Sequence, residues 1–427
     1  MTLRIGDKGS IVSAFQLALL RAGFLSEKPD GVFGDLTQNA VFEFQKAFGL
    51  TADGIIGTDT EKYLSQFIKG FFIKKIQKND TIWKISIDTG TPISYILTAN
   101  PLIDVYNLIP GENITVPYNF SVTATDIPYS YYLTENIIMG LKYRYPFIET
   151  ETIGKSVMNN NISSIVIGTG QKEIFINAGF HSNEWLNIPV ILKFTEEYLK
   201  AISENKTFYG YNAKELYNST KVHLVPLVNP DGLDLVTNAL KDGEYYRKAQ
   251  AISNNYPAIP FPDGWKANIN GVDLNLQFPA NWEKAKEIKF SQGFTKPSPI
   301  EYVGTAPLSE PEAAVIFEYT QNNNFKLILA YHSQGEIIYW KYEDFLPPES
   351  KRIGEILSNA SGYPLEITPY DSSYAGYKDW FIERYNRPGY TVETGIGSNP
   401  LPIEQFNKIY SDNKVLLAAA IFETSML

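Results

Sequence analysis

The 427-residue chain contains no cysteine, only three histidines and no long uninterrupted apolar run. Without cysteine the protein has neither disulfide bonds nor thiolate ligands, so any metal site must use histidine and carboxylate side chains. No stretch reaches the roughly 18 consecutive apolar residues of a membrane-spanning helix. Positive charge is also scarce, because 37 Lys and Arg against 47 Asp and Glu leave a net charge of −10. That balance argues against nucleic acid as a partner.

The N-terminal residues 1–8 contain no apolar segment of the kind that a secretory signal carries. We therefore expect export through a signal already removed, by a non-classical route, or by release inside a sporulating or lysing cell. The remaining composition, 44% hydrophobic and 20% charged, is that of a folded protein, and the length suits about two to four domains.

Two of the three histidines stand where a metal site could form. The apolar run 173–180 predicts a β-strand that ends at His181, and Glu184 follows one helical turn later on the same face. A second strand-like run, 325–331, ends at His332. Zinc accepts two imidazoles and one carboxylate and keeps a fourth position for water. A His-x-x-Glu pair alone is weak evidence, since a helix cap beside an unrelated surface carboxylate gives the same pattern.

The third histidine and one late glutamate occupy apolar runs with different implications. His223 lies in the strand-like run 221–226 with no acidic residue at ligand spacing, so we interpret it as a hydrogen-bonded residue in or near the core. Glu393 ends the apolar-flanked run 389–393. An unpartnered carboxylate would be costly there, which favours a functional role.

Further short motifs follow in a fixed order. They are Asn229-Pro-Asp-Gly232, Gly271-Val-Asp-Leu-Asn275, Ser309-Glu-Pro-Glu-Ala313 and Thr391-Val-Glu-Thr394. With His181, Glu184 and His332 they resemble the zinc carboxypeptidases of the carboxypeptidase A superfamily over roughly residues 125–427. The resemblance implies an α/β catalytic domain with a mixed, mostly parallel sheet flanked by helices. It also implies one zinc ion bound by these three residues, and Glu393 as the general base.

Departures from this family concern the residues that hold the substrate. In Asn275-Leu-Gln-Phe278, Leu276 replaces an arginine that grips the C-terminal carboxylate of a substrate, and Asn275 and Gln277 flank it at the expected substrate-binding position. Asn159-Asn-Asn-Ile162 replaces another arginine-bearing segment. Lys266 takes the place of the oxyanion-side arginine, where it keeps the charge but loses the bidentate fork. A solvated surface lysine is the alternative for Lys266.

Two more positions resemble residues that contact the substrate side chain in this family. Lys378 corresponds to the side-chain-specificity residue, where a lysine would favour an acidic group on the substrate. The mobile phenol of the family corresponds to Tyr374, with Tyr370 as the alternative.

The first part of the chain contains an internal repeat. Asp30-Gly-Val-Phe-Gly-Asp-Leu-Thr37 recurs as Asp53-Gly-Ile-Ile-Gly-Thr-Asp-Thr60, and each unit can form a tight turn followed by a threonine-capped helix. The apolar spacing between the units predicts a small helical bundle. Residues 3–67 resemble the peptidoglycan-binding type 1 domain. A purely structural bundle is the alternative, but it leaves the repeated motif unexplained.

The next segment runs from Phe71 through Asn100-Pro101 to residues 108–117. It resembles one LysM repeat, a two-helix, two-strand binder of glycans that contain N-acetylglucosamine. Asn79-Asp-Thr81 replaces the common Gly-Asp-Thr start, a mild change because asparagine also tolerates positive φ. Two different wall-binding modules indicate bacterial peptidoglycan as the partner.

We therefore expect three domains: a peptidoglycan-binding bundle over 1–69, a βααβ LysM module over 70–118 and the catalytic domain over 119–427. The resemblance to modular wall peptidases implies hydrolysis of the bond between γ-D-glutamate and meso-diaminopimelate in peptidoglycan stem peptides, at the cell wall or outside the cell. The alternatives are a carboxypeptidase that trims the last residue of the stem and a wall-binding protein that has lost its activity.

Overall fold

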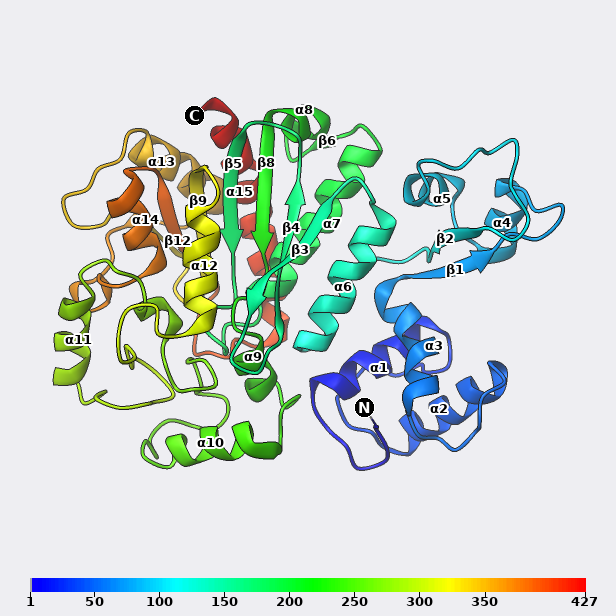
Figure 1. Cartoon of the computed structure of the whole chain (residues 1–427), viewed down its shortest axis with the longest axis horizontal. Coiled ribbons are helices and arrows are strands. Elements are labelled where there is room, and N and C mark those ends of the chain that lie inside the picture. Colours follow the sequence, from blue (N-terminus) through cyan, green and yellow to red (C-terminus); the bar gives the residue numbers. More distant parts are fainter. Residues whose placement is uncertain (1) are drawn as a thin grey trace. The chain divides into compact units, whose positions relative to one another are not determined.

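The structure, a computed structural model, describes residues 2–427, and the chain divides into two compact units, Met1–Glu149 and Thr150–Leu427 (Figure 1). The first unit extends beyond the two expected small modules because helix α6 (Tyr131–Arg144) packs against α3 (Thr58–Lys69). Gly140 allows this approach, since a Cβ there would lie 2.1 Å from the carbonyl oxygen of Lys69. No helix among residues 2–427 is both long and apolar enough to cross a membrane.

The expected helical bundle is formed by α1 (Ser10–Arg21), α2 (Asp35–Ala47) and α3, and the sequence repeat is also a repeat of hydrogen bonds. The buried Gln16 side chain donates to Asp30 Oδ1 at 2.8 Å and to Thr37 Oγ1 at 3.0 Å. The equivalent Gln45 side chain makes the corresponding bonds to Asp53 at 2.9 Å and Thr60 at 3.0 Å.

The expected threonine caps are wrong. Helices α2 and α3 begin after Gly34 and Gly57 without a side-chain cap, and the two threonines are buried acceptors for the glutamine amides. The motif therefore specifies a buried hydrogen-bonded turn, because each threonine hydroxyl accepts from a glutamine of the preceding helix instead of capping its own helix.

Residues 71–117 adopt the expected βααβ arrangement. Its elements are β1 (Phe71–Lys75), α4 (Ile82–Thr89), α5 (Ile93–Ala99) and β2 (Asn113–Pro117). The two strands are antiparallel, with Phe71 opposite Pro117. Asn100, just after α5, donates to Thr115 O at 2.7 Å and accepts from Thr115 N at 2.9 Å. This residue therefore joins the second helix to the second strand around an apolar core.

The second unit is built on one eight-stranded sheet in the order β11-β10-β12-β9-β5-β8-β4-β3. The strands are β3 (Glu149–Lys155), β4 (Asn161–Ile167), β5 (Lys172–Asn177), β8 (Thr220–Val225), β9 (Phe325–His332), β10 (Ile337–Tyr339), β11 (Leu365–Glu366) and β12 (Gly389–Glu393). Neighbours from β12 through β9 and β5 to β8 are parallel, whereas β10 with β12 and β4 with β8 are antiparallel. The prediction of a mixed, mostly parallel sheet is confirmed.

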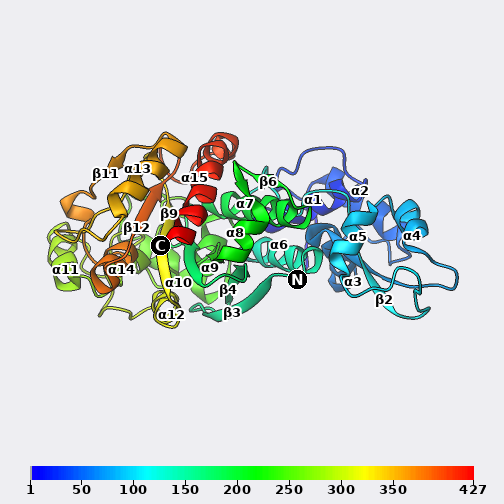
Figure 2. The same cartoon turned by 90° about the horizontal axis from the view of Figure 1, so that it is seen from above.

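Helices cover both faces of this sheet. Helices α7 (Asn187–Ser203) and α15 (Phe406–Met426) lie on one face, and α12 (Pro311–Gln321) lies on the other (Figure 2). The remaining helices are α8 (Ala213–Ser219), α9 (Pro230–Val236), α10 (Gly243–Ser253), α11 (Trp282–Ser291), α13 (Ser350–Ser361) and α14 (Tyr377–Tyr385). Because β5, β9 and β12 are parallel, their carboxyl ends meet at one edge, where residues from separate parts of the chain come together.

Candidate metal centre and active site

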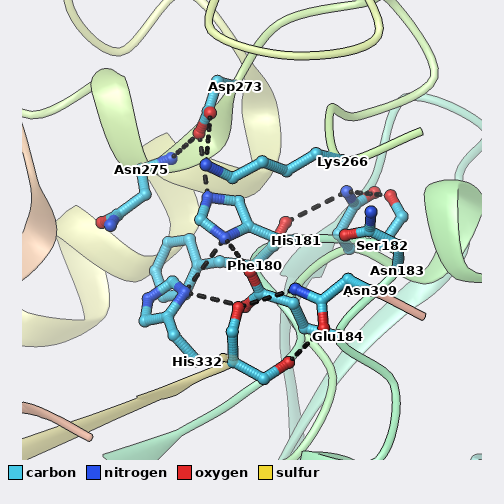
Figure 3. A network of polar contacts seen from close by, with 12 residues as sticks. Phe180, His181, Ser182, Asn183, Glu184, Lys266, Asp273, Asn275, His332 and Asn399 are labelled. Carbon is cyan, nitrogen blue, oxygen red and sulfur yellow. Dashed lines mark hydrogen bonds and ion pairs between the residues drawn. The ribbon is translucent and has the colours of Figure 1, made fainter. Parts of the chain in front are cut away.

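His181, Glu184 and His332 converge at the carboxyl ends of β5 and β9 (Figure 3). His181 Nδ1 lies 2.8 Å from Glu184 Oε1, His332 Nδ1 lies 3.0 Å from Glu184 Oε2, and the two Nδ1 atoms are 3.0 Å apart. All three side chains are buried. Two imidazole nitrogens facing one carboxylate form a donor set that suits a single zinc ion.

The local structure around the ligands differs from the sequence prediction in two details. Strand β5 ends at Asn177, so His181 follows a short irregular connection rather than the strand itself. Glu184 lies in a turn before α7, where its amide donates to His181 O at 3.2 Å, so the predicted helical turn is wrong. The ligands still meet, because a tight turn brings residues three apart together as a helix does.

Asp273 contacts His181 on the ring nitrogen that faces away from the other two ligands. Its Oδ1 lies 3.0 Å from His181 Nε2 and also accepts from Asn275 N at 3.0 Å, while its Oδ2 lies 3.4 Å from Lys266 Nζ. A carboxylate on one ring nitrogen orients the other nitrogen towards a metal. The Gly271–Asn275 motif contains this aspartate, but the sequence alone does not assign it a role; its place in the motif is the signal that indicates one.

Burial and neighbouring charges shift the pKa values of the three ligands in different directions. Burial opposes ionisation of Glu184, but His181 and His332 outweigh it and lower the pKa of this carboxyl to about 2. Burial lowers the pKa of His332 and so favours its neutral, ligating form. For His181 the carboxylates of Glu184 and Asp273 outweigh burial and raise the pKa to about 9, so metal binding there releases a proton.

Glu393 ends strand β12, in register with His332 on β9. It lines a cavity of about 390 Å³ together with His181, Glu184 and Lys266. Burial raises the pKa of Glu393 to about 8, and the neighbouring Glu184 carboxylate adds to this effect. A carboxylate whose pKa lies near neutrality can accept a proton and return it.

Lys266 also lines the cavity, with 26% of its side chain exposed, so it is not the fully solvated lysine of the alternative interpretation. Burial lowers the pKa of this amine, but the carboxylates of Asp273, Glu301, Glu184 and Glu393 outweigh burial and raise it. The cavity therefore holds a permanent cation beside the metal ligands.

Asn275, Leu276 and Gln277, which we predicted to bind the substrate, point to different parts of the structure. Asn275 lines the cavity, and neither Leu276 nor Gln277 is among the lining residues. Leu276 packs in an apolar cluster with Trp282 and Val303, and Gln277 is buried and accepts from Glu310 N at 3.1 Å. The short 3₁₀ helix η1 (Leu274–Leu276) directs the leucine into the core, so this position offers no group for a substrate carboxylate.

Lys378 lines the cavity but is already bound on all sides. Its Nζ lies 2.7 Å from Asp379 Oδ1 and donates to Lys341 O at 2.8 Å and to Thr368 Oγ1 at 3.1 Å. An ammonium group has three donors, and these partners occupy them. Lys378 therefore forms an internal ion pair at the predicted specificity position, and its preference for an acidic group on the substrate stays a prediction.

Tyr374 and Tyr370 do not line the cavity; their segment contributes Thr368, Pro369 and Ser372 instead. The two rings contact each other edge to face at 5.6 Å, and Tyr370 is 58% exposed. The remaining lining residues, which the sequence motifs do not indicate, come from strands β10 and β12 and from connections between elements. They are Asn183, Ile300, Ser333, Gln334, Tyr339, Gly376, Thr391 and Asn399.

Several motif residues form a second cluster of buried carboxylates, which we call the scaffold cluster: Asp231, Glu310 and Glu312. Asp231 accepts from Ser156 Oγ at 2.7 Å, Met158 N at 2.8 Å and Asn160 Nδ2 at 2.9 Å. Asn268 Nδ2 lies 2.7 Å from Glu310 Oε2 and 3.2 Å from Glu312 Oε2, and Val157 N donates to Glu312 Oε1 at 3.1 Å. The Asn159–Ile162 segment thus serves the scaffold through Asn160.

His223 lies in strand β8, as the sequence predicts for a core histidine. Its Nδ1 lies 2.7 Å from Tyr319 Oη, and burial lowers its pKa to about 4. The prediction of a buried, hydrogen-bonded histidine is confirmed.

The fold and the His181–Glu184–His332 centre define a zinc-dependent peptidase. The model of the zinc carboxypeptidase family matches residues 134–415, and the chain belongs to this family. Residues 8–64 match a putative peptidoglycan binding domain.

Individual relatives agree with this assignment. The chain is 44% identical over 295 residues to gamma-D-glutamyl-L-diamino acid endopeptidase 1 of Lysinibacillus sphaericus, covering 69% of this chain and 72% of the relative. It is 40% identical over 281 residues to the uncharacterized protein YqgT of Bacillus subtilis, covering 65% and 73%. Among solved structures, thrombin activatable fibrinolysis inhibitor matches with a TM-score of 0.55 at 18% identity, covering 71% and 78%, which shows a shared fold.

Proposed function

We propose that the enzyme hydrolyses the bond between γ-D-glutamate and meso-diaminopimelate in peptidoglycan stem peptides. The observation that carries this proposal is the 44% identity, over most of both chains, to a relative whose name specifies a γ-D-glutamyl-L-diamino acid bond. The cavity supports it, because Leu276 packs in the core where a carboxypeptidase needs a cation for a terminal carboxylate. In a tetrapeptide stem the corresponding carboxyl of diaminopimelate is already amidated.

The chemistry divides among few residues. When bound by His181, Glu184 and His332, zinc supplies Lewis-acid activation of water and of the scissile carbonyl. Glu393 accepts a proton during attack and delivers it to the leaving amine, which its raised pKa permits. Lys266 faces the same cavity and stabilises negative charge that develops on the carbonyl oxygen.

Residues 1–69 and 70–118 bring the enzyme to its substrate under this proposal. The peptidoglycan-binding match covers the first of these modules. We assign the βααβ module as a LysM repeat that binds glycan strands, because Leu102 and Tyr106 are 98% and 97% exposed and Trp83 is 66% exposed. Apolar and aromatic side chains held in solvent offer stacking surfaces for sugar rings. The site of action is the cell wall, including that of a sporulating or lysing cell.

Mass spectrometry of muropeptides tests the reaction. Disaccharide tripeptides and tetrapeptides that contain meso-diaminopimelate are incubated with the zinc-loaded protein and, in parallel, with the Glu393→Gln variant. The proposal expects release of a diaminopimelate-containing fragment, with L-Ala-D-Glu left on the sugar, by the wild-type protein only. Release of the terminal residue alone would instead identify a carboxypeptidase. Absence of any zinc-dependent product would leave a wall-binding protein.

A further inference from the structure

We infer that Glu301 is a positioning residue that, together with Lys289, holds Lys266 in place for catalysis. The inference rests on the proposed role of Lys266 in the reaction. Lys266 Nζ lies between two carboxylates, 3.4 Å from Asp273 Oδ2 and 3.4 Å from Glu301 Oε1. The second oxygen of Glu301 lies 2.5 Å from Lys289 Nζ. Anions and cations thus alternate from the residue behind His181 to helix α11.

Lys266 needs such support because of its chemistry. A lysine ends a flexible four-carbon stem in a single ammonium group, whereas the arginine of related enzymes has a rigid, planar fork. The backbone of Lys266 is fixed, since its carbonyl accepts from Ser182 N at 3.1 Å and its amide donates to Pro299 O at 2.9 Å. Two carboxylates restrain the far end of the side chain, and Figure 3 shows it reaching Asp273 beside His181.

Glu301 is itself held in an unusual conformation. Its φ is +63°, in the left-handed region that residues other than glycine seldom adopt. The preceding residue, Ile300, lines the cavity. The carboxylate of Glu301 thus reaches Lys266 while its neighbour faces the cavity. Local strain of this kind is retained when the surrounding contacts compensate for it, and the two lysines supply such contacts.

Lys289 connects this network to another wall of the cavity. Its side chain is only 6% exposed, and Nζ donates to Asp371 O at 2.9 Å. Asp371 belongs to the short helix η2 (Tyr370–Ser372), whose Ser372 lines the cavity. Lys289 therefore fixes one oxygen of the Glu301 carboxylate and also binds the segment that contains Ser372. The other oxygen of Glu301 then holds the ammonium group of Lys266.

A double-mutant cycle distinguishes positioning from a general structural role. We would measure kcat and KM on the disaccharide tripeptide for Glu301→Gln, Lys266→Met and the double variant. We expect Glu301→Gln to lower kcat about tenfold with little change in KM, and Lys266→Met to lower it about a hundredfold. If Glu301 acts through Lys266, the double variant is no slower than Lys266→Met. The control is Glu287→Gln, which removes an exposed ion-pair partner of Lys284 on helix α11, the helix that carries Lys289. This variant should match the wild type.

Independent losses that multiply in the double variant would overturn the inference, as would loss of bound zinc in Glu301→Gln. Should Glu301→Gln fold poorly because Lys289 is left unpaired, Glu301→Gln/Lys289→Met removes both charges and is measured in its place. Lys266→Arg provides a second test, because its fork needs less support, and Glu301→Gln should cost it less than threefold. If the wild type releases no diaminopimelate fragment, the proposed function fails. If it does but the losses multiply, only this inference fails.

Discussion

The catalytic unit contains two clusters of buried carboxylates that differ in their partners. Glu184, Asp273 and Glu393 face histidine and lysine side chains around an open cavity, whereas the scaffold cluster is hydrogen-bonded to neutral amides and hydroxyls. Burial raises the pKa of Glu312 to about 7 and that of Glu393 to about 8. A raised pKa therefore does not identify the catalytic carboxylate. Access to the cavity and neighbouring histidine and lysine side chains do.

The largest predicted effect is a difference in kcat/KM between variants of Glu393 and Glu312. Glu393→Gln keeps the shape and removes the proton acceptor, so kcat/KM should fall by about 10²–10⁴-fold while zinc content stays unchanged. Glu312→Gln makes the same chemical change in the scaffold cluster and should leave kcat/KM close to that of the wild type. Steady-state kinetics with zinc analysis of both variants checks this. Equal losses would show that burial alone determines the role.

Lys378 and Asp379 combine features of both clusters. They line the cavity, as the active-site residues do, but their charges pair with each other. Lys378→Met should lower the free energy of unfolding by about 3–5 kcal/mol, since a buried carboxylate loses its partner. Lys378→Met/Asp379→Asn should recover much of that loss. Urea unfolding measures both. A variant with unchanged stability that discriminates poorly against substrates lacking the distal carboxylate would instead place Lys378 on the substrate.

Local sequence patterns predict the reaction side of the cavity well. His181 lies after β5 and His332 ends β9, two strands whose apolar pattern is visible, and parallel pairing then brings His181, His332 and Glu393 to one edge. The substrate side is harder to predict, because its geometry depends on packing between distant segments. Nothing local shows that Leu276 turns into a core with Val303, or that Lys378 pairs with its own neighbour.

The scaffold cluster should produce a pH dependence of stability of predictable sign. The unfolded pKa of Glu312 is 4.5 and its folded pKa is about 7, so the folded state retains a proton that the unfolded state releases. The stability associated with this proton is fully present below pH 4.5 and is lost as pH rises to 7. The loss is about 1.4 kcal/mol per pH unit, or about 3 kcal/mol in total.

Urea unfolding of the wild type and Glu312→Gln between pH 4.5 and 7.5, in chelator, measures this loss. The wild type should lose about 3 kcal/mol relative to the variant. His223, whose lowered pKa gives a slope of opposite sign, contributes equally to both proteins and cancels in the difference. Parallel curves for the two proteins would contradict a protonated Glu312 near neutral pH.

The smallest effect should come from Asp231, which has neutral donors on both carboxylate oxygens. Asp231→Asn keeps the size but turns one acceptor oxygen into a donor, which then faces a donor of Ser156, Met158 or Asn160. The free energy of unfolding should fall by about 1–3 kcal/mol with kcat unchanged. Asp242→Asn, at an exposed residue with no side-chain cap bond, is the matched control and should have no effect. If Asp231→Asn instead lowers kcat while the free energy of unfolding is unchanged, Asp231 contributes to the reaction. Neutral hydrogen-bond partners would then no longer distinguish the scaffold cluster from the carboxylates of the active site.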